Sequence, residues 1–312
     1  MVEICHAYRG LSICYLIDTS PHSSIYVCTI SNKIKIRKKE IKMACRDAYK
    51  NQAKNSDLFA AANQSAENEL LSNTNNDKLL FGVDSKVKSD CVLQNNLTEF
   101  DWAARNKLYP NFWGRNITGE NSLTKDEIAF LHGKGCKIAA IFTSTDPKET
   151  EEQGKIHAKK VAITALELSI PENTAIFLEI EDDINVSSDY MKGYAQSLLS
   201  EGYIPGFKAN TDAAYDFDRQ YSAGMQSDKE VFSKCLIWAV SPSLKEYERI
   251  TTTHIIHPDN WTPYAPSGSS RNTIAVWQYG KDCHPINDDK GAETTFNINL
   301  VKNDKIIINM MF

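Results

Sequence analysis

The sequence lacks several patterns that would assign it to a familiar class of protein. No apolar stretch approaches the roughly 18 residues that cross a membrane as a helix. Residues 1–30 lack the basic start and the small-residue cleavage site of a secretory signal, so we expect a cytoplasmic protein or one released without a classical signal. The net charge of -5, from 35 basic and 40 acidic residues, offers no broad basic surface for nucleic acid.

The sequence also lacks the common motifs of metal-binding sites and of catalytic nucleophiles. The eight cysteines are scattered and none forms a CxxC pair, so neither a zinc ribbon nor a thioredoxin-like site is expected. No serine lies in a GxSxG elbow and no HExxH occurs, which leaves serine hydrolases and zinc proteases without support. There is also no EF-hand loop. We therefore expect neither a bound metal nor a cofactor.

The N-terminal part divides into two segments. Residues 1–42 show no clear periodic element, and the codons of KKEIKM permit a ribosome-binding site, AAGGAG, shortly before the ATG of Met43. We therefore expect translation to begin at Met43, with residues 1–42 absent from the native protein or disordered. Residues 43–78 are predicted to form a helical extension, because residues 44–71 contain no Gly or Pro and a polar break follows at 72–77.

From residue 79 onward, short apolar runs alternate with helix-like segments. The runs predicted as strands are 78–84, 111–117, 137–144, 175–181, 203–209, 235–241 and 274–280, with a weaker one at 253–257. The segments predicted as helices are 123–135, 148–169 and 187–202. In the first helix, Thr124 is followed three residues later by Glu127, the spacing of a capping box. Eight strands alternating with helices in residues 79–312 predict a (β/α)8 TIM-type barrel, and an open doubly wound sheet is the alternative.

The fourth predicted strand ends in a crowd of acidic residues. In AIFLEIEDD (175–183), side chains alternate along the strand, so Glu179, Glu181 and Asp183 share one face. Because helices cover the outside of a barrel, we expect this face to point to the barrel axis at the C-terminal mouth. Asp84, at the end of the first strand, should reach the same mouth. Clustered carboxylates raise the pKa of one member, which favours a general acid beside an ionised partner, the pairing that cleaves glycosidic bonds.

We assign Glu181 as the general acid and Glu179 or Asp84 as the anionic partner. One alternative is a salt bridge between Glu179 and Arg115, which would make the charge structural. Another is a hard-cation site built from carboxylate oxygens. For Asp183, a solvated loop is the alternative to substrate contact.

Aromatic residues on the late strands are candidate sugar contacts. Trp238, Trp277 and Tyr279 lie in predicted strands, and Trp277 and Tyr279 share a face. Aromatic faces at a barrel mouth suit sugar rings, although core packing is the alternative reading of each tryptophan. Arg115, late in the second strand, is a candidate to hold a carboxylate or a charged group of the substrate.

Several of these stretches together resemble a known family. FGVDS, FWGRNITGENSLTKDEI and EGYIPGFKAN resemble segments of the glycoside-hydrolase-like domains of the DUF1906 type, and WQYG and FNINLV resemble the ending of the related family 25 lysozymes. Asn116 and Asn297 stand where these families have a tyrosine and an aspartate. The lysozyme pattern places its carboxylate pair on Glu179 and Glu181, and the DUF1906 pattern places it on Glu181 and Asp183.

The resemblance implies a glycoside hydrolase-like barrel over residues 79–312 that acts on bacterial cell-wall polysaccharide, with a polysaccharide or peptidoglycan fragment as its partner. A barrel that binds saccharide without cleaving it is the second hypothesis. Under the lysozyme pattern, Glu179 replaces an aspartate, and catalytic geometry is sensitive to the extra methylene. The third hypothesis is an intracellular regulator without a sugar ligand. The sequence does not predict an oligomeric state.

Overall fold

The computed structural model describes the strands at residues 2–8, 11–17 and 25–31, and the ranges 79–144, 149–182, 185–250, 261–269, 273–285, 294–302 and 309–312. The chain divides into two compact units, residues 1–74 and 75–312. The predicted helices at 44–71 and the weak predicted strand at 253–257 lie outside the described residues.

The first unit contains a three-stranded antiparallel sheet formed by β1 (Val2–Tyr8), β2 (Leu11–Ile17) and β3 (Ile25–Ser31). Its strands are rich in Val, Ile and Tyr, which favour extended backbone. The sequence analysis found no regular element in residues 1–42, and this differs from the structure. The apolar residues of LSICYLI follow one another without the alternation that marks a half-buried strand.

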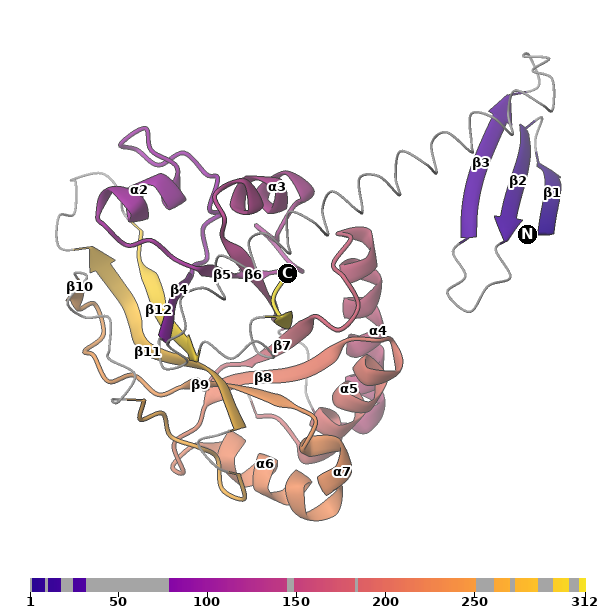
Figure 1. Ribbon diagram of the computed structural model, residues 1–312. Helices are drawn as coiled ribbons and strands as arrows, with labels where there is room; N and C mark the ends of the chain where they lie inside the picture. Colours follow the sequence, from indigo (N-terminus) through magenta and orange to yellow (C-terminus); the bar gives the residue numbers. More distant parts are fainter. Residues whose placement is uncertain are drawn as a thin grey trace, which may run out of the picture. The chain divides into compact units, whose positions relative to one another are not determined.

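The second unit is a closed eight-stranded barrel with helices between its strands (Figure 1). Its parallel strands in chain order are β4 (Leu79–Asp84), β5 (Phe112–Asn116), β6 (Lys137–Phe142), β7 (Ala175–Ile180), β8 (Ile204–Asn210) and β9 (Leu236–Val240). Strand β9 then pairs with β11 (Ile274–Pro285), and β12 (Phe296–Lys302) joins β11 to β4, which closes the ring. The predicted barrel is confirmed, and every predicted strand run other than 253–257 corresponds to one of these strands.

Strand β12 departs from the predicted all-parallel arrangement, because it runs antiparallel to both β11 and β4. Two parallel strands need a crossover of about a dozen residues or more. Only residues 286–295 connect β11 to β12, which favours an antiparallel pair. A short strand, β10 (Arg249–Ile250), adds to β11 outside the ring.

The described helices lie on the outside of the strands (Figure 1). They are α2 (Glu99–Arg105), α3 (Lys125–Gly133), α4 (Glu151–Glu167), α5 (Ser188–Ser200), α6 (Asp216–Ser227) and α7 (Lys229–Phe232). The predicted N-cap at Thr124 is confirmed, since its hydroxyl accepts the Glu127 N–H at 3.3 Å. The Glu127 carboxylate, however, pairs with Arg115 of β5 instead of returning to the helix start.

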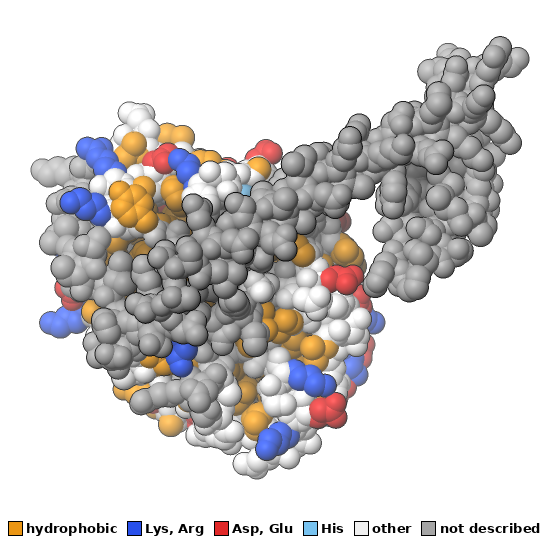
Figure 2. Space-filling model, in the orientation of Figure 1, with side chains coloured by type: hydrophobic (Ala, Val, Ile, Leu, Met, Phe, Trp, Pro, Cys, Tyr) orange, Lys and Arg blue, Asp and Glu red, His pale blue; other side chains and the backbone are white. Residues whose placement is uncertain are grey.

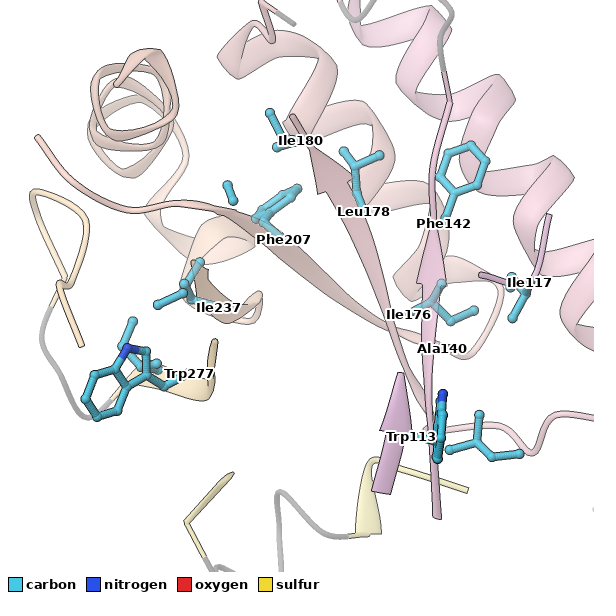
Figure 3. Close-up of a cluster of buried hydrophobic side chains, with 14 of the residues drawn as sticks. Trp113, Ile117, Ala140, Phe142, Ile176, Leu178, Ile180, Phe207, Ile237 and Trp277 are labelled. Carbon is cyan, nitrogen blue, oxygen red and sulfur yellow. The ribbon is translucent and has the colours of Figure 1, made fainter. Parts of the chain in front are cut away.

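Apolar side chains pack on both faces of the barrel wall. On the outer face, Leu178 and Ile180 of β7 pack toward the helices (Figure 3). On the inner face, the rings of Phe177 and Trp238 meet edge to face, with centroids 5.3 Å apart. Met311 belongs to the same inner cluster, and its neighbour Phe312 exchanges backbone hydrogen bonds with Ile138. The apolar side chains of the inner cluster fill the interior of the barrel. A ligand therefore has access only where polar side chains take their place.

Among the side chains that are coloured by type in Figure 2, basic and acidic ones are interspersed. Exposed apolar side chains such as Ile163 and Leu166 of α4 lie between charged neighbours. None of the described helices combines the length and the apolar composition that crossing a membrane requires.

Candidate active site

Polar side chains face the barrel axis where the parallel strands end. Strand β7 places Glu179 on the inner face, two residues beyond Phe177 of the inner cluster. Strand β8 places Lys208 on the same face, two residues beyond Gly206, which lies against the Phe177 ring. Strand β4 ends at Asp84. We call Asp84, Glu179 and Lys208 the mouth cluster, and it brings together two of the predicted site residues.

Lys208 joins the two carboxylates of the mouth cluster. Its Nζ lies 2.7 Å from Asp84 Oδ1 and 2.9 Å from Glu179 Oε1. It also lies 5.0 Å from the centroid of the Trp238 ring, a favourable place for a cation. Burial opposes the charge of Lys208, but the two carboxylates outweigh burial and raise its pKa above the ordinary value. Lys208 is therefore charged at neutral pH.

Asp84 is fully engaged by protein groups. Its Oδ1 accepts hydrogen bonds from Lys208 and, at 3.0 Å, from Asn297 Nδ2, and its Oδ2 accepts one from Asn299 Nδ2 at 2.8 Å. Asn299 is held in turn by Trp238, whose Nε1 donates to Oδ1 at 2.9 Å. Asp84 is 5% exposed and is bonded to the Lys208 ammonium. The predicted catalytic role of Asp84 stays a prediction.

Glu179 retains contact with solvent, since 25% of its side chain is exposed. Its Oε2 lies 2.8 Å from the Thr143 hydroxyl, and the Asn116 side chain lies 2.7 Å from the same hydroxyl. Burial by itself would raise the pKa of Glu179. The charge of Lys208 and the hydrogen bonds from Lys208 and Thr143 outweigh burial and lower this pKa below the ordinary value. Glu179 is therefore ionised at neutral pH, as an anionic partner must be.

Glu181 lies just beyond the end of β7 and is exposed to solvent. Within the described part of the chain, no group forms a hydrogen bond or an ion pair with its carboxylate. Asp183, the third acidic residue predicted on this face, lies outside the described residues.

Arg115 faces away from the mouth. In β5 it is Gly114 that faces inward, because a Cβ at that position would meet the side chains of Asp84 and Trp238. Arg115 consequently points toward the helices, where Nε lies 2.8 Å from Glu127 Oε1 and the side chain is 1% exposed. This geometry agrees with neither hypothesis for Arg115, the salt bridge with Glu179 or the contact with a substrate. Arg115 makes a structural ion pair across the outer wall.

The aromatic residues predicted to contact sugar are all buried. Trp277 and Tyr279 share a face as predicted, but it is the outer one, where Trp277 packs against Trp261 with centroids 5.8 Å apart. Trp238 faces inward, yet it is 0% exposed and lies among the inner cluster. These positions correct the predicted aromatic rim. The residue of WQYG that faces the barrel axis is Gln278.

Lys208 is the residue of the mouth cluster that sequence reasoning missed. The signal was present in IPGFKAN, where the lysine shares its face with Gly206 and Asn210 in a strand that is otherwise apolar. A buried ammonium needs an anionic partner. Asn297 and Asn299, which alternate with apolar residues in FNINLV, give a similar signal for an inward polar face.

A metal ion does not account for the mouth cluster. In the ranges that the structure describes, no group of three or more His, Cys, Asp or Glu is arranged to hold a metal. The Lys208 ammonium already supplies the positive charge that Asp84 and Glu179 attract.

Residues 109–299, more than half of the chain, match the sequence model of a family described as Rv2525c-like, glycoside hydrolase-like domain. Among solved structures, an uncharacterized B. stearothermophilus protein is 25% identical, with 75% of this chain and 100% of that chain covered and a TM-score of 0.61. A family 25 glycosyl hydrolase from Bacillus anthracis is 16% identical, with 72% and 90% covered and a TM-score of 0.43. A bacterial lysozyme from Streptomyces coelicolor is 10% identical, with 72% and 93% covered and a TM-score of 0.41. None of the curated proteins is significantly similar to this chain.

Proposed function

The chain belongs to the Rv2525c-like, glycoside hydrolase-like domain family, and from that membership we propose that it hydrolyses a glycosidic bond in bacterial cell-wall polysaccharide. The observation that carries the proposal is the position of Glu179 at the barrel mouth, paired with Lys208 at 2.9 Å, with the exposed Glu181 two residues further on. Glycoside hydrolysis uses two carboxyl groups, one protonated and one ionised. The choice of cell-wall polysaccharide rests on the resemblance of WQYG and FNINLV to lysozyme motifs.

Glu181 is the general acid in this proposal. It protonates the oxygen of the leaving sugar, for which an exposed side chain beside the mouth is well situated.

Glu179 is the anionic partner. It either stabilises the positive charge that develops at the anomeric carbon or activates the attacking water. Lys208 keeps Glu179 ionised, and Asp84 keeps Lys208 in place through the 2.7 Å contact. The roles of the two glutamates thus differ because, among the described residues, Glu179 has a cation within ion-pair distance and Glu181 has none.

A barrel that binds saccharide without cleaving it is the second candidate function. The observation that favours it is the ion pair itself, because Lys208 compensates the negative charge of Glu179 that catalysis would use. In this case the mouth would still offer polar groups to sugar hydroxyls.

One comparison separates the two functions. The purified full-length chain is incubated with peptidoglycan, and released reducing ends are measured for the wild type, Glu181→Gln and Glu167→Gln. Glu167 is an exposed carboxylate at the C-terminal end of α4, and it serves as the matched control. Hydrolysis predicts release by the wild type and the control, with a loss of at least about a hundredfold in Glu181→Gln.

Binding to insoluble peptidoglycan is measured for the same three proteins by co-sedimentation. Binding by all of them without release of reducing ends would replace the proposed hydrolysis by saccharide binding. Release that is equal in the wild type and Glu181→Gln would remove Glu181 from the mechanism.

A further inference from the structure

Helix α4, on the outside of the barrel (Figure 1), carries a group of exposed apolar side chains. Ile156, Ile163 and Leu166 are exposed to 56%, 59% and 67%. Residues three and seven apart share a face of a helix, so these three form one surface, which we call the α4 stripe. The other large apolar side chains that are exposed in the described ranges lie outside the helices and strands: Val92, Tyr109, Tyr215, Tyr247 and Tyr264.

The α4 stripe does not hold the helix on the barrel, because a different face of α4 does so. Val161 and Ala165 are among the buried residues of that face. A Cβ at Gly154 would meet the backbone of Tyr190 and Tyr194, so α4 already packs closely on α5. A surface helix with one packed face usually presents polar residues on the other side. The exposed apolar stripe therefore indicates a second contact.

Charged residues border the α4 stripe on both sides. Lys159, Lys160 and Glu167 are exposed, and none of them forms a salt bridge within the described part of the chain. At 3.6 residues per turn, Lys160 and Glu167 lie about 60° and 40° to one side of Ile163. Lys159 and Leu166 lie about 40° and 60° to the other side. One border thus carries both signs of charge, and the other carries a lysine beside a leucine.

We infer that the α4 stripe is a contact surface for a second copy of this chain, with the two α4 helices antiparallel about a two-fold axis at Ile163. The Ile163 side chains of the two copies meet at the axis. Lys160, three residues before the axis, lies beside the partner's Glu167, four residues after it, and the symmetry repeats this pair. On the other border, Leu166 packs on the aliphatic part of the partner's Lys159. The inference is independent of the proposed function, because α4 supplies no residue of the mouth cluster.

The charges select this register over the alternatives. A parallel pair would set each Lys160 beside the partner's Lys160, and an antiparallel pair centred one turn earlier would bring Lys159 and Lys160 of both copies together. Like charges brought together in this way oppose association. The axis at Ile163 instead separates the lysines of the two copies and places Lys160 beside a carboxylate.

The size of the surface predicts a weak dimer. Helix α4 has 17 residues and is therefore about 25 Å long. A contact made by one helix from each copy buries less than the roughly 1,600 Å² of a standard protein–protein interface. We expect a dissociation constant on the order of 100 µM.

Analytical ultracentrifugation of the full-length chain tests the dimer. Over a range from about 5 to about 500 µM, the average mass should rise from that of the 35.1 kDa monomer toward twice that value. Ile163→Asp places two carboxylates at the axis and should raise the dissociation constant at least about tenfold. Val92→Asp is the matched control, because it makes a similar change at a 64% exposed side chain between β4 and α2. It should leave the association unchanged.

A charge exchange tests the antiparallel register. Lys160→Glu and Glu167→Lys each turn both ion pairs of the dimer into contacts between like charges, so each variant alone should associate about fivefold more weakly than the wild type. In an equal mixture of the two variants, a heterodimer regains both attractive pairs and should form as tightly as the wild-type dimer. Damage to the fold of α4 in either variant would not be repaired by mixing.

A chain that stays monomeric over the whole range would overturn the inference, and so would a dimer that survives Ile163→Asp. A mixture of the two charge variants that associates no better than either alone would refute the antiparallel pairing. Co-sedimentation of a monomeric chain with phosphatidylglycerol vesicles, lost in Ile163→Asp, would assign the stripe to a lipid surface instead. The hydrolysis assay is run well below the expected dissociation constant, so Glu167→Gln remains its matched control.

Discussion

The barrel wall separates two buried ion-pair clusters that differ in one decisive respect. On the inside, Lys208 bridges Asp84 and Glu179, and Glu179 keeps a quarter of its side chain exposed. On the outside, Arg115 pairs with Glu127, and both side chains are almost completely buried, at 1% and 0% exposure. Both clusters join neighbouring strands or helices, but of the two only the inner one has a charged side chain that is partly exposed to solvent.

The outer cluster is satisfied by the protein itself. The Arg115 guanidinium donates to the backbone carbonyls of Ser85 and Val87 at 2.9 and 3.1 Å. The Glu127 carboxylate accepts the N–H and the hydroxyl of Ser89 at 2.8 and 2.9 Å. These contacts hold the loop after β4 in place. The comparison teaches that exposure to solvent, more than charge, distinguishes the candidate site from the scaffold.

The largest loss of stability is expected when the cation of either cluster, Lys208 or Arg115, is replaced by an uncharged residue. Lys208→Met leaves two buried carboxylates without a counter-charge, and Arg115→Met leaves one, so each should lower the free energy of unfolding by about 3–5 kcal/mol. Urea unfolding at pH 7 measures both losses. If Lys208→Met is as stable as the wild type, the inner ion pairs do not form in solution.

Glu99 is expected to make the stability of the chain depend on pH, because burial raises the pKa of its carboxyl group. Glu99 Oε1 accepts from the hydroxyls of Ser85 and Thr294 at 2.7 and 2.9 Å, and these residues adjoin the strands that carry Asp84 and Asn297. Burial raises the pKa of Glu99 from 4.5 to about 8, while those hydrogen bonds and the charge of Arg115 oppose the shift. Between these two pH values, the folded state holds a proton that the unfolded state has released. Stability therefore falls as the pH rises from about 4.5 to about 8.

Glu99→Gln should remove this pH dependence, because glutamine keeps the acceptor and has no proton to lose. At pH 8 the variant is expected to be more stable than the wild type, by a difference on the order of 3 kcal/mol, and at pH 4.5 the difference should be close to zero. Urea unfolding across this range provides the measurement. A constant difference between the two proteins at all pH values would contradict the raised pKa.

Glu179→Gln should change the stability of the chain least and its activity strongly. Glu179→Gln leaves Lys208 paired with Asp84, so a loss of only about 1 kcal/mol is expected, together with a loss of at least a hundredfold (about 2.7 kcal/mol) in release of reducing ends. Glu127→Gln on the outer side leaves the buried Arg115 charge without its carboxylate, so it should destabilise the chain by about 3–5 kcal/mol and leave the activity of the folded protein unchanged. Normal activity in Glu179→Gln together with lost activity in Glu127→Gln would contradict the roles given to the two clusters.

The sequence predicted the barrel and the inward direction of Glu179, because the alternation of AIFLEIE distinguishes its two faces. It did not predict the direction of WQYG. Both faces of a barrel strand are buried, so the tryptophan and the tyrosine fit the outer wall as well as the mouth. The same ambiguity applied to Arg115, whose direction was decided by the close approach of Gly114 to Asp84.

The pairing of Lys208 depends on contacts between residues far apart in the chain. Asp84 and Lys208 are separated by 124 positions, and Asp84 and Asn299 by 215. No local pattern contains such a pair, and it appears only when the ring closes. The antiparallel β12 was missed for a related reason, since its neighbours β11 and β4 come from opposite ends of the barrel sequence.

The most direct test is a carbon NMR titration of the glutamate carboxyl groups in the wild-type chain, with the Glu179 signal identified by its absence in Glu179→Gln. Lys208 at 2.9 Å should keep the Glu179 midpoint below the ordinary value of 4.5. A midpoint above that value would show that burial outweighs the ammonium, and it would contradict the claim that Lys208 stabilises the ionised form of Glu179.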